Sequence, residues 1–142
     1  MLRVRYLLSL KEPTVWSIEA ESPVLEAIQL MADKRIGALP VMRGDELVGI
    51  VSERDYARKV ILLGRSSSDT PVWQIMSSPV KTVTPEEEVH RCMEIMTEQR
   101  IRHLPVLEQG KMIGMISIGD LVKAVIDEQQ QTIDQLERYI AG

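Results

Sequence analysis

The fold is decided by two stretches, RIGALPVMRGDELVGIVSERD at residues 35–55 and RIRHLPVLEQGKMIGMISIGD at residues 100–120. Both carry Leu-Pro-Val, then a turn, then Gly and Ser-x-x-Asp at matching places, 65 positions apart (120 − 55 = 65). When residues 15–60 are laid on residues 80–125 without a gap, 13 of the 46 positions are identical. Because a pattern repeated at a fixed offset indicates a repeated structural unit, we predict the same supersecondary unit twice.

Each copy shows the same order of local patterns. A β-branched run comes first, and apolar residues at helical spacing follow it. A buried strand with Leu-Pro-Val, a turn and a hairpin partner come next, and a second helix begins near Asp55 or Asp120. We therefore predict an α/β (α+β) fold made of two β-α-β-β-α units. The first strands are expected at residues 15–18 and 80–83.

Five segments are expected along the chain. Residues 71–76 are predicted to be a helical lead-in to the second copy, as residues 4–8 are to the first, and a Ser-rich stretch separates the copies. The tail carries an apolar stripe of the kind that docks on the body or on a second subunit. The expected segments are a lead-in helix at 1–13, unit 1 at 14–64, a linker at 65–72, unit 2 at 73–127 and a C-terminal helix at 128–142.

Composition narrows the class of protein. The 142 residues are 44% hydrophobic but only 4% aromatic, with no Phe, so the core must be aliphatic. The net charge of −4 argues against a nucleic-acid binder, which usually has a basic field. A single cysteine favours a reducing cytoplasm. The apolar runs are too short for a membrane span or a secretory signal, so no membrane association is expected.

The Ser-x-x-Asp sequences, with Ser52 and Asp55 in one copy and Ser117 and Asp120 in the other, lie where a strand leads into a helix. A helix N-terminus presents unpaired N–H groups and attracts anions. A carboxylate at this place can accept two hydrogen bonds from the cis-diol of a ribose. The same residues also suit a simple helix cap, and that alternative stays open.

Two β-α-β-β-α units with these motifs resemble the cystathionine-β-synthase (CBS) domain pair, over residues 4–127. The resemblance implies a stand-alone CBS-pair protein of the bacterial or archaeal kind, with two units packed sheet to sheet about a pseudo-twofold axis. It implies two clefts that bind AMP, ADP, ATP, NAD or S-adenosylmethionine, and assembly as a homodimer.

The resemblance also assigns roles to residues. Asp55 and Asp120 would bind the ribose hydroxyls, while Ser52 and Ser117 would reach toward phosphate. Strand ends would hold the base, although Ile18 and Val83, each taken singly, are better explained as ordinary strand core. The cleft at the second aspartate would contain Trp16, Ile36, Gly37, Arg102, His103, Met115, Ser117, Gly119 and Asp120. The cleft at the first would contain Ala38, Ile50, Ser52, Arg54, Asp55, Lys81, Val83 and Ile101.

The two clefts are expected to differ. Arg102 and His103 stand where the first copy has Gly37 and Ala38, so the cleft at Asp120 should hold a phosphate more firmly. A cationic His103 would also make affinity depend on pH. Alternatively, Arg102 is a solvated strand-end charge and His103 a packing residue.

The sequence favours a regulatory module over an enzyme. It has no P-loop, HExxH, paired CxxC or GxSxG motif, so neither catalytic nor metal-binding residues are assigned. AMP and NAD are the favoured ligands, because one Arg-His pair suits few phosphates. An unidentified effector protein would read the ligand state. The alternative is a structural or interaction module whose clefts are unused.

Overall fold

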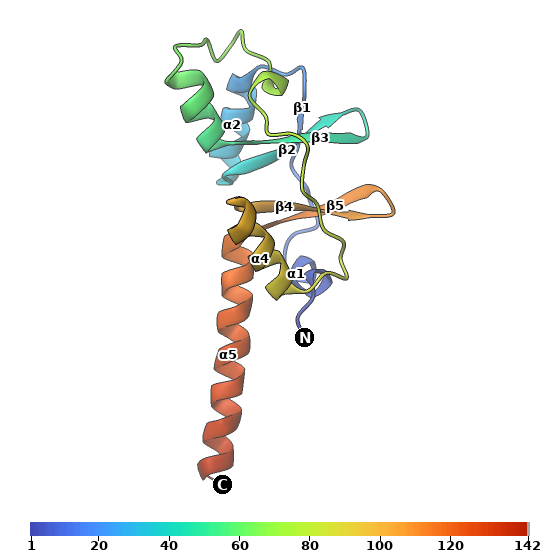
Figure 1. Cartoon of the computed structure of the whole chain (residues 1–142), viewed down its shortest axis with the longest axis vertical. Helices are drawn as coiled ribbons and strands as arrows, with labels where there is room; N and C mark the ends of the chain where they lie inside the picture. The colour runs from blue at the N-terminus through green and yellow to red at the C-terminus, as the bar shows by residue number, and fades with distance from the viewer. Residues whose placement is uncertain (142) are drawn as a thin grey trace. The chain divides into compact units, whose positions relative to one another are not determined.

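The computed structural model describes residues 1–141 (Figure 1) and divides them into two compact units. One unit contains residues 14–81 and therefore the first repeat. The other contains residues 1–13 and 82–141, and therefore the second repeat. The predicted mixed helix and strand fold is confirmed, and the structure divides its strands between two small sheets.

The first-repeat unit is built on a three-stranded sheet in the order β1-β2-β3, with β1 parallel and β3 antiparallel to β2. Helix α2 packs its apolar side chains, among them Val24, Ala27 and Met31, into the core. The elements are β1 (Ile18–Glu19), α2 (Val24–Lys34), β2 (Ala38–Arg43), β3 (Glu46–Ser52), α3 (Glu53–Tyr56), the π-helical turn η1 (Ala57–Ile61) and the 3₁₀ turn η2 (Val72–Gln74).

The second-repeat unit is built on the antiparallel pair β4-β5. Val83 adds a single parallel bridge to Val106, at the place that β1 has in the first repeat. Helix α4 buries Val89, Cys92 and Met96, the residues whose spacing predicted it. The elements are α1 (Val4–Ser9), α4 (Val89–Gln99), β4 (His103–Glu108), β5 (Lys111–Ser117) and α5 (Ile118–Ala141).

The two hairpins have the same register. Ala38 pairs with Ser52 and His103 pairs with Ser117, and each hairpin has a register shift after the valine of Leu-Pro-Val. The order β-α-β-β-α predicted from the repeat is therefore present in the first-repeat unit. The second-repeat unit follows the same order, but its first strand is reduced to the single bridge of Val83.

The first strands are much shorter than predicted. In the first repeat the strand contains only residues 18–19. In the second repeat only Val83 pairs with the middle strand, at Val106. Trp16 is exposed, so the run that precedes Ile18 does not enter the core. A β-branched run thus marked the strand but not its length.

The lead-in segments pack with the repeat opposite to the one expected. Val4 donates its N–H to the Glu87 carbonyl, while Val72 donates to that of Ser22, which is the equivalent residue 65 positions earlier. Val4 is fully buried in the second-repeat core and Val72 in that of the first. Residues 1–13 therefore complete the second repeat, and residues 71–76 complete the first.

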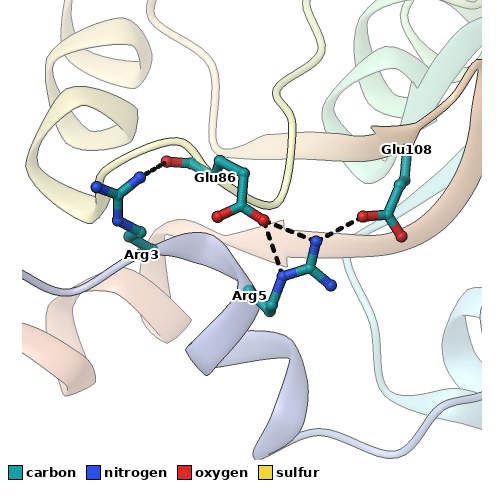
Figure 2. Close-up of polar contacts among 4 residues, drawn as sticks. All are labelled: Arg3, Arg5, Glu86 and Glu108. Atoms are coloured by element: carbon teal, nitrogen blue, oxygen red, sulfur yellow. Dashed lines mark hydrogen bonds and ion pairs between the residues drawn. The ribbon is translucent and has the colours of Figure 1, made fainter.

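Arg5 ties α1 to the second repeat (Figure 2). Its guanidinium donates to Glu86 Oε1 at 2.7 and 2.9 Å and to Glu108 Oε2, while Arg3 donates to the Glu86 carbonyl at 3.0 Å. These hydrogen bonds, first to Glu108 and then to Glu86, raise the pKa of Arg5 above its ordinary value. Because these charged side chains are exposed, their ion pairs add little stability, and their main effect is to orient α1 on the unit.

The tail also differs from the expectation of a separate C-terminal helix. Residues 118–141 form one uninterrupted helix, α5, which includes the second helix of the repeat. Good helix formers occupy this region and no Gly or Pro interrupts residues 120–141, so nothing ends the helix near residue 128. The predicted boundary between unit 2 and a C-terminal helix at residue 128 therefore falls inside one continuous helix.

Candidate functional site

Ser52 and Asp55 form a reciprocal cap at the start of α3. The Asp55 N–H donates to Ser52 Oγ at 3.1 Å, and the Ser52 N–H and hydroxyl donate to Asp55 Oδ2 at 2.9 and 3.0 Å. A Ser three residues before an acidic residue favours this arrangement, because each side chain pairs with an otherwise free backbone donor.

Ser117 and Asp120 repeat the arrangement at the start of α5. The Asp120 N–H donates to Ser117 Oγ at 3.2 Å, and the Ser117 N–H donates to Asp120 Oδ2 at 2.9 Å. The cap anticipated as an alternative role is therefore present in both copies. Capping involves only Oδ2 of each carboxylate, so it does not exclude a second role for Oδ1.

A backbone hydrogen bond fixes each helix start beside the residue that precedes the middle strand. Glu53 donates its N–H to the Gly37 carbonyl at 3.1 Å, and Ile118 donates to the Arg102 carbonyl at 2.9 Å. Each Ser-x-x-Asp is thus brought together with the residues at equivalent positions, Gly37 and Ala38 in one unit and Arg102 and His103 in the other.

A lysine contacts each aspartate, but from different parts of the chain. Lys59 Nζ lies 3.2 Å from Asp55 Oδ1, one turn along the same helical segment, and donates to the Ile75 carbonyl. The position equivalent to Lys59 in the second repeat is Ala124. There the cation is Lys11, which donates to Asp120 Oδ2 at 2.8 Å and to the Met115 carbonyl at 2.7 Å.

The two carboxylates differ in exposure and in free acceptor capacity. The side chain of Asp55 is 12% exposed and that of Asp120 is 28% exposed. Within residues 1–141, Oδ1 of Asp120 accepts no hydrogen bond, whereas Oδ1 of Asp55 contacts Lys59. Asp120 therefore offers the more accessible acceptor.

Asp120 is held in its ionised form. Its partial burial alone would raise the pKa, but the hydrogen bonds from Lys11 and Ser117 outweigh burial and lower the pKa below its ordinary value. Asp120 is therefore a carboxylate, and an acceptor only, at neutral pH.

His103 and Arg102 have different environments. Burial is the main cause that lowers the pKa of His103, and Lys11 and Arg102 add to it against the opposing charge of Asp120. His103 is therefore neutral at pH 7. Arg102 is exposed, and no salt bridge among residues 1–141 includes it. Its guanidinium is available to an anion.

The other residues predicted for the sites are distributed between the two units. The side chain of Val83 belongs to the second-repeat core, and Ile101 packs against that core. Ile36 packs against the first-repeat core, and Trp16 is exposed with Lys34 Nζ 4.2 Å from its ring centroid. Ala38, Ile50, Arg54 and Lys81 also belong to the first-repeat unit, while Met115 and Gly119 belong to the second.

Within one unit the structure brings together Arg102, His103, Ser117 and Asp120. In the other it brings together Gly37, Ala38, Ser52 and Asp55. The predicted clefts draw on both units, and the approach of Trp16, Ile36 or Lys81 to the aspartate of the opposite unit stays a prediction.

Sequence reasoning missed both lysines. Lys59 could have been found, since a residue four positions after Asp55 on a helix faces it. Lys11 could not, because its contact depends on residues 1–13 packing with the second repeat.

Across residues 1–141, no cluster of three or more His, Cys, Asp or Glu side chains is arranged to hold a metal ion. In the same range, no helix is both long and apolar enough to cross a membrane.

Comparison with known proteins decides the family. The sequence model of the CBS domain matches twice, at residues 10–62 and 72–127. The chain belongs to the CBS domain family. It is a CBS pair, a kind of module that generally serves regulation or signal transduction.

Relatives of this CBS pair cover nearly all of it. A candidate signal-transduction protein with CBS domains from Burkholderia ambifaria is 51% identical, with a TM-score of 0.87 over 90% of this chain and 96% of that one. A mitochondrial CBS domain-containing protein of Arabidopsis thaliana is 46% identical over 127 residues, 86% of this chain and 62% of the relative. The chain thus spans less than two thirds of that plant protein.

A third relative is the hexameric CBS-CP12 protein from bloom-forming cyanobacteria. It is 29% identical, with a TM-score of 0.76 over 86% of this chain and 70% of that one.

Proposed function

We propose that this CBS pair is a non-catalytic regulatory module that binds an adenine nucleotide at its Ser-x-x-Asp helix starts. The observation that carries the proposal is the repetition. Two carboxylates 65 positions apart lie at equivalent helix starts, each with its Oδ2 fixed by the serine of its motif. Oδ2 is thereby oriented before any ligand arrives, and pre-ordered groups bind at a lower entropic cost.

The chemistry of Asp120 suits a ribose. Its Oδ1 is free among the described contacts and can accept one hydroxyl hydrogen bond, while Oδ2 can accept the second if Lys11 moves aside. A carboxylate that accepts from two neighbouring hydroxyls is the usual way to recognise a cis-diol.

Arg102 favours a ligand with phosphate. Its backbone carbonyl is fixed by Ile118, and its side chain is an unpaired, exposed cation within residues 1–141. Neutral His103 adds a single hydrogen-bond donor and no charge. One cation suits the monophosphate of AMP or the shared diphosphate of NAD better than a triphosphate. ATP, ADP and S-adenosylmethionine remain weaker candidates.

Regulation would follow from differential affinity. A nucleotide can shift the arrangement of the units, or of a homodimer, only if it binds one state more tightly. A partner protein would then read that state. We place this activity in a reducing compartment such as the cytoplasm, in keeping with a single buried cysteine.

A second candidate is a structural module with unused sites. The observation that favours it is that each aspartate already serves as a cap and an ion-pair partner without any ligand. In this second candidate, the Ser-x-x-Asp sequences serve only to stabilise the fold.

Titration calorimetry with AMP and NAD separates the two candidates. Asp120→Asn keeps an oxygen for the Ser117 N–H but removes the charge, so we expect at least a tenfold weaker nucleotide affinity. The broken Lys11 ion pair should cost at most about 1 kcal/mol of stability. Asp134→Asn is a matched control, since it makes the same change on the same helix, outside the motif. Absence of binding by the wild-type protein to every adenine compound would favour the structural module.

A further inference from the structure

Helix α5 extends well beyond the body of its unit. With 24 residues and a rise of about 1.5 Å each, it is about 36 Å long. Its buried side chains are Leu121 and Ala124, both near its start, whereas residues 129–141 contain none. Figure 1 shows this part of α5 running away from the β4-β5 hairpin of the same unit.

The exposed apolar side chains of α5 follow a heptad repeat. Successive spacings of 4, 3, 4, 3 and 4 residues connect the positions Val122, Ile126, Gln129, Ile133, Leu136 and Ile140. The five apolar members are between 40% and 83% exposed. A spacing of 3.5 residues that is sustained in this way is typical of a helix that pairs with another helix. We call these six residues the heptad face.

We propose that the heptad face binds the same face of a second copy of this chain, and that the two helices run antiparallel. This interface does not depend on the proposed nucleotide binding. In the antiparallel register centred on residue 131, Val122 lies against Ile140 of the second copy and Ile126 lies against its Leu136. Gln129 then lies against Ile133, so each layer contains at least one aliphatic side chain.

Charge decides the orientation. In the antiparallel register Lys123 lies beside Glu137 of the second copy, and by symmetry the opposite pair forms as well. A parallel pair would place Thr132 of one helix beside Glu137 of the other, so Glu137 would face no opposite charge in either helix. It would also bury two Gln129 side chains against each other, so the antiparallel pair is the more complementary one.

A membrane surface fits this helix less well. Residues 118–141 contain five acidic residues and two basic ones, whereas helices that lie on anionic bilayers are rich in Lys and Arg. A free helix of about 13 residues is also only marginally stable in water, and pairing supplies the apolar contacts that it lacks.

Cysteine cross-linking tests the orientation. Ile140→Cys alone should form no disulfide-linked dimer under mild oxidation, because the two residues 140 would be 18 residues apart along the paired helices, about 27 Å. Val122→Cys/Ile140→Cys should be linked efficiently. The native Cys92 is buried and adds no background. Efficient linking of Ile140→Cys alone would overturn the antiparallel arrangement, and failure of both variants would overturn the interface.

Charge exchange provides a second test, read by sedimentation equilibrium. Lys123→Glu should weaken self-association several-fold, and Lys123→Glu/Glu137→Lys should restore it. Leu136→Lys should abolish association through the helix, while the neighbouring Gln135→Lys, outside the heptad face, should leave it unchanged. The proposal would be contradicted if Leu136→Lys had the same sedimentation mass as the wild-type protein. It would also be contradicted if the double exchange failed to restore association. AMP titrations of the same variants measure nucleotide binding separately, so a failure of the helix interface can be distinguished from a failure of the nucleotide site.

Discussion

Lys11 Nζ lies 2.8 Å from Asp120 Oδ2, although the two residues are 109 positions apart in the sequence. The first repeat reaches the same result locally, with Lys59 four residues after Asp55. The two copies thus pair their motif aspartates with a cation by different routes. The pairing at Asp120 depends on the segment that precedes the first repeat.

Replacing Lys11 by Met should raise the pKa of Asp120 toward its ordinary value. Burial raises the pKa of Asp120, and the variant loses the Lys11 hydrogen bond and charge that oppose burial together with the hydrogen bonds from Ser117. Carbon-detected NMR titration of the Asp120 carboxyl measures this change directly. Lys59→Met is the control, since its carboxylate partner is Asp55, and it should not move the Asp120 titration.

The same pair makes stability depend on pH. A carboxylate whose pKa is lowered by folding stabilises the fold above its unfolded pKa of about 4, and this stabilisation is lost as the pH falls through the folded pKa. Lys11→Met should therefore cost up to about 1 kcal/mol at pH 7, the upper end for a partly exposed pair. The cost should vanish in acid, as urea unfolding can show. An equal cost at every pH would mean that Lys11 acts by packing alone.

His103 should oppose folding in mild acid. Its pKa is lowered by burial, so the folded protein binds fewer protons than the unfolded chain as the pH falls through about 6.5. Stability should decrease from pH 7 toward pH 5, and His103→Gln should flatten that part of the profile. Nucleotide affinity should not change between pH 7 and 8, because His103 stays neutral throughout.

Gly114 is a contact point for α1. A Cβ at this position would lie 2.5 Å from Leu8 Cδ2, closer than side chains normally approach. Gly114→Ala should therefore destabilise the protein by about 1 kcal/mol, the low end for overpacking, because the Leu8 methyl group ends a flexible side chain that can move. Adding Leu8→Ala should recover part of the loss in thermal unfolding. No recovery in the double variant would show that α1 does not pack there.

Cys92 should be unreactive in the folded protein. Burial is the main cause that raises the pKa of its thiol to about 11, so almost no thiolate exists at pH 8. Iodoacetamide should modify Cys92 only in proportion to unfolding, followed by mass spectrometry across a denaturant series. Complete modification within minutes in native buffer would contradict this placement.

The fold could be predicted from the sequence because the chain contains the same pattern twice, at a fixed offset of 65 residues. Leu39, Val41 and their partners at 104 and 106 are buried as their strand pattern required, and the helices bury the residues at helical spacing. Sequence alone could not show which repeat residues 1–13 or 71–76 complete. Val4 and Val72 have similar apolar surroundings in the sequence, and only tertiary hydrogen bonds to Glu87 and Ser22 distinguish them.

The candidate site was predictable in its local part only. Ser52 with Asp55 and Ser117 with Asp120 could be recognised, because a helix start and its cap lie within four residues. Lys11 lies outside that range. The exposed Trp16 shows the converse limit, since a β-branched neighbourhood predicted a strand where the chain does not enter the sheet.

The most direct test compares AMP with its 2′,3′-dideoxy analogue by titration calorimetry on the wild-type protein. The analogue keeps the base and the phosphate but lacks both ribose hydroxyls. If Asp120 and Asp55 hold the ribose, AMP should bind and the analogue should bind at least tenfold more weakly. Equal affinities for the two compounds would contradict the account, whatever else the protein binds.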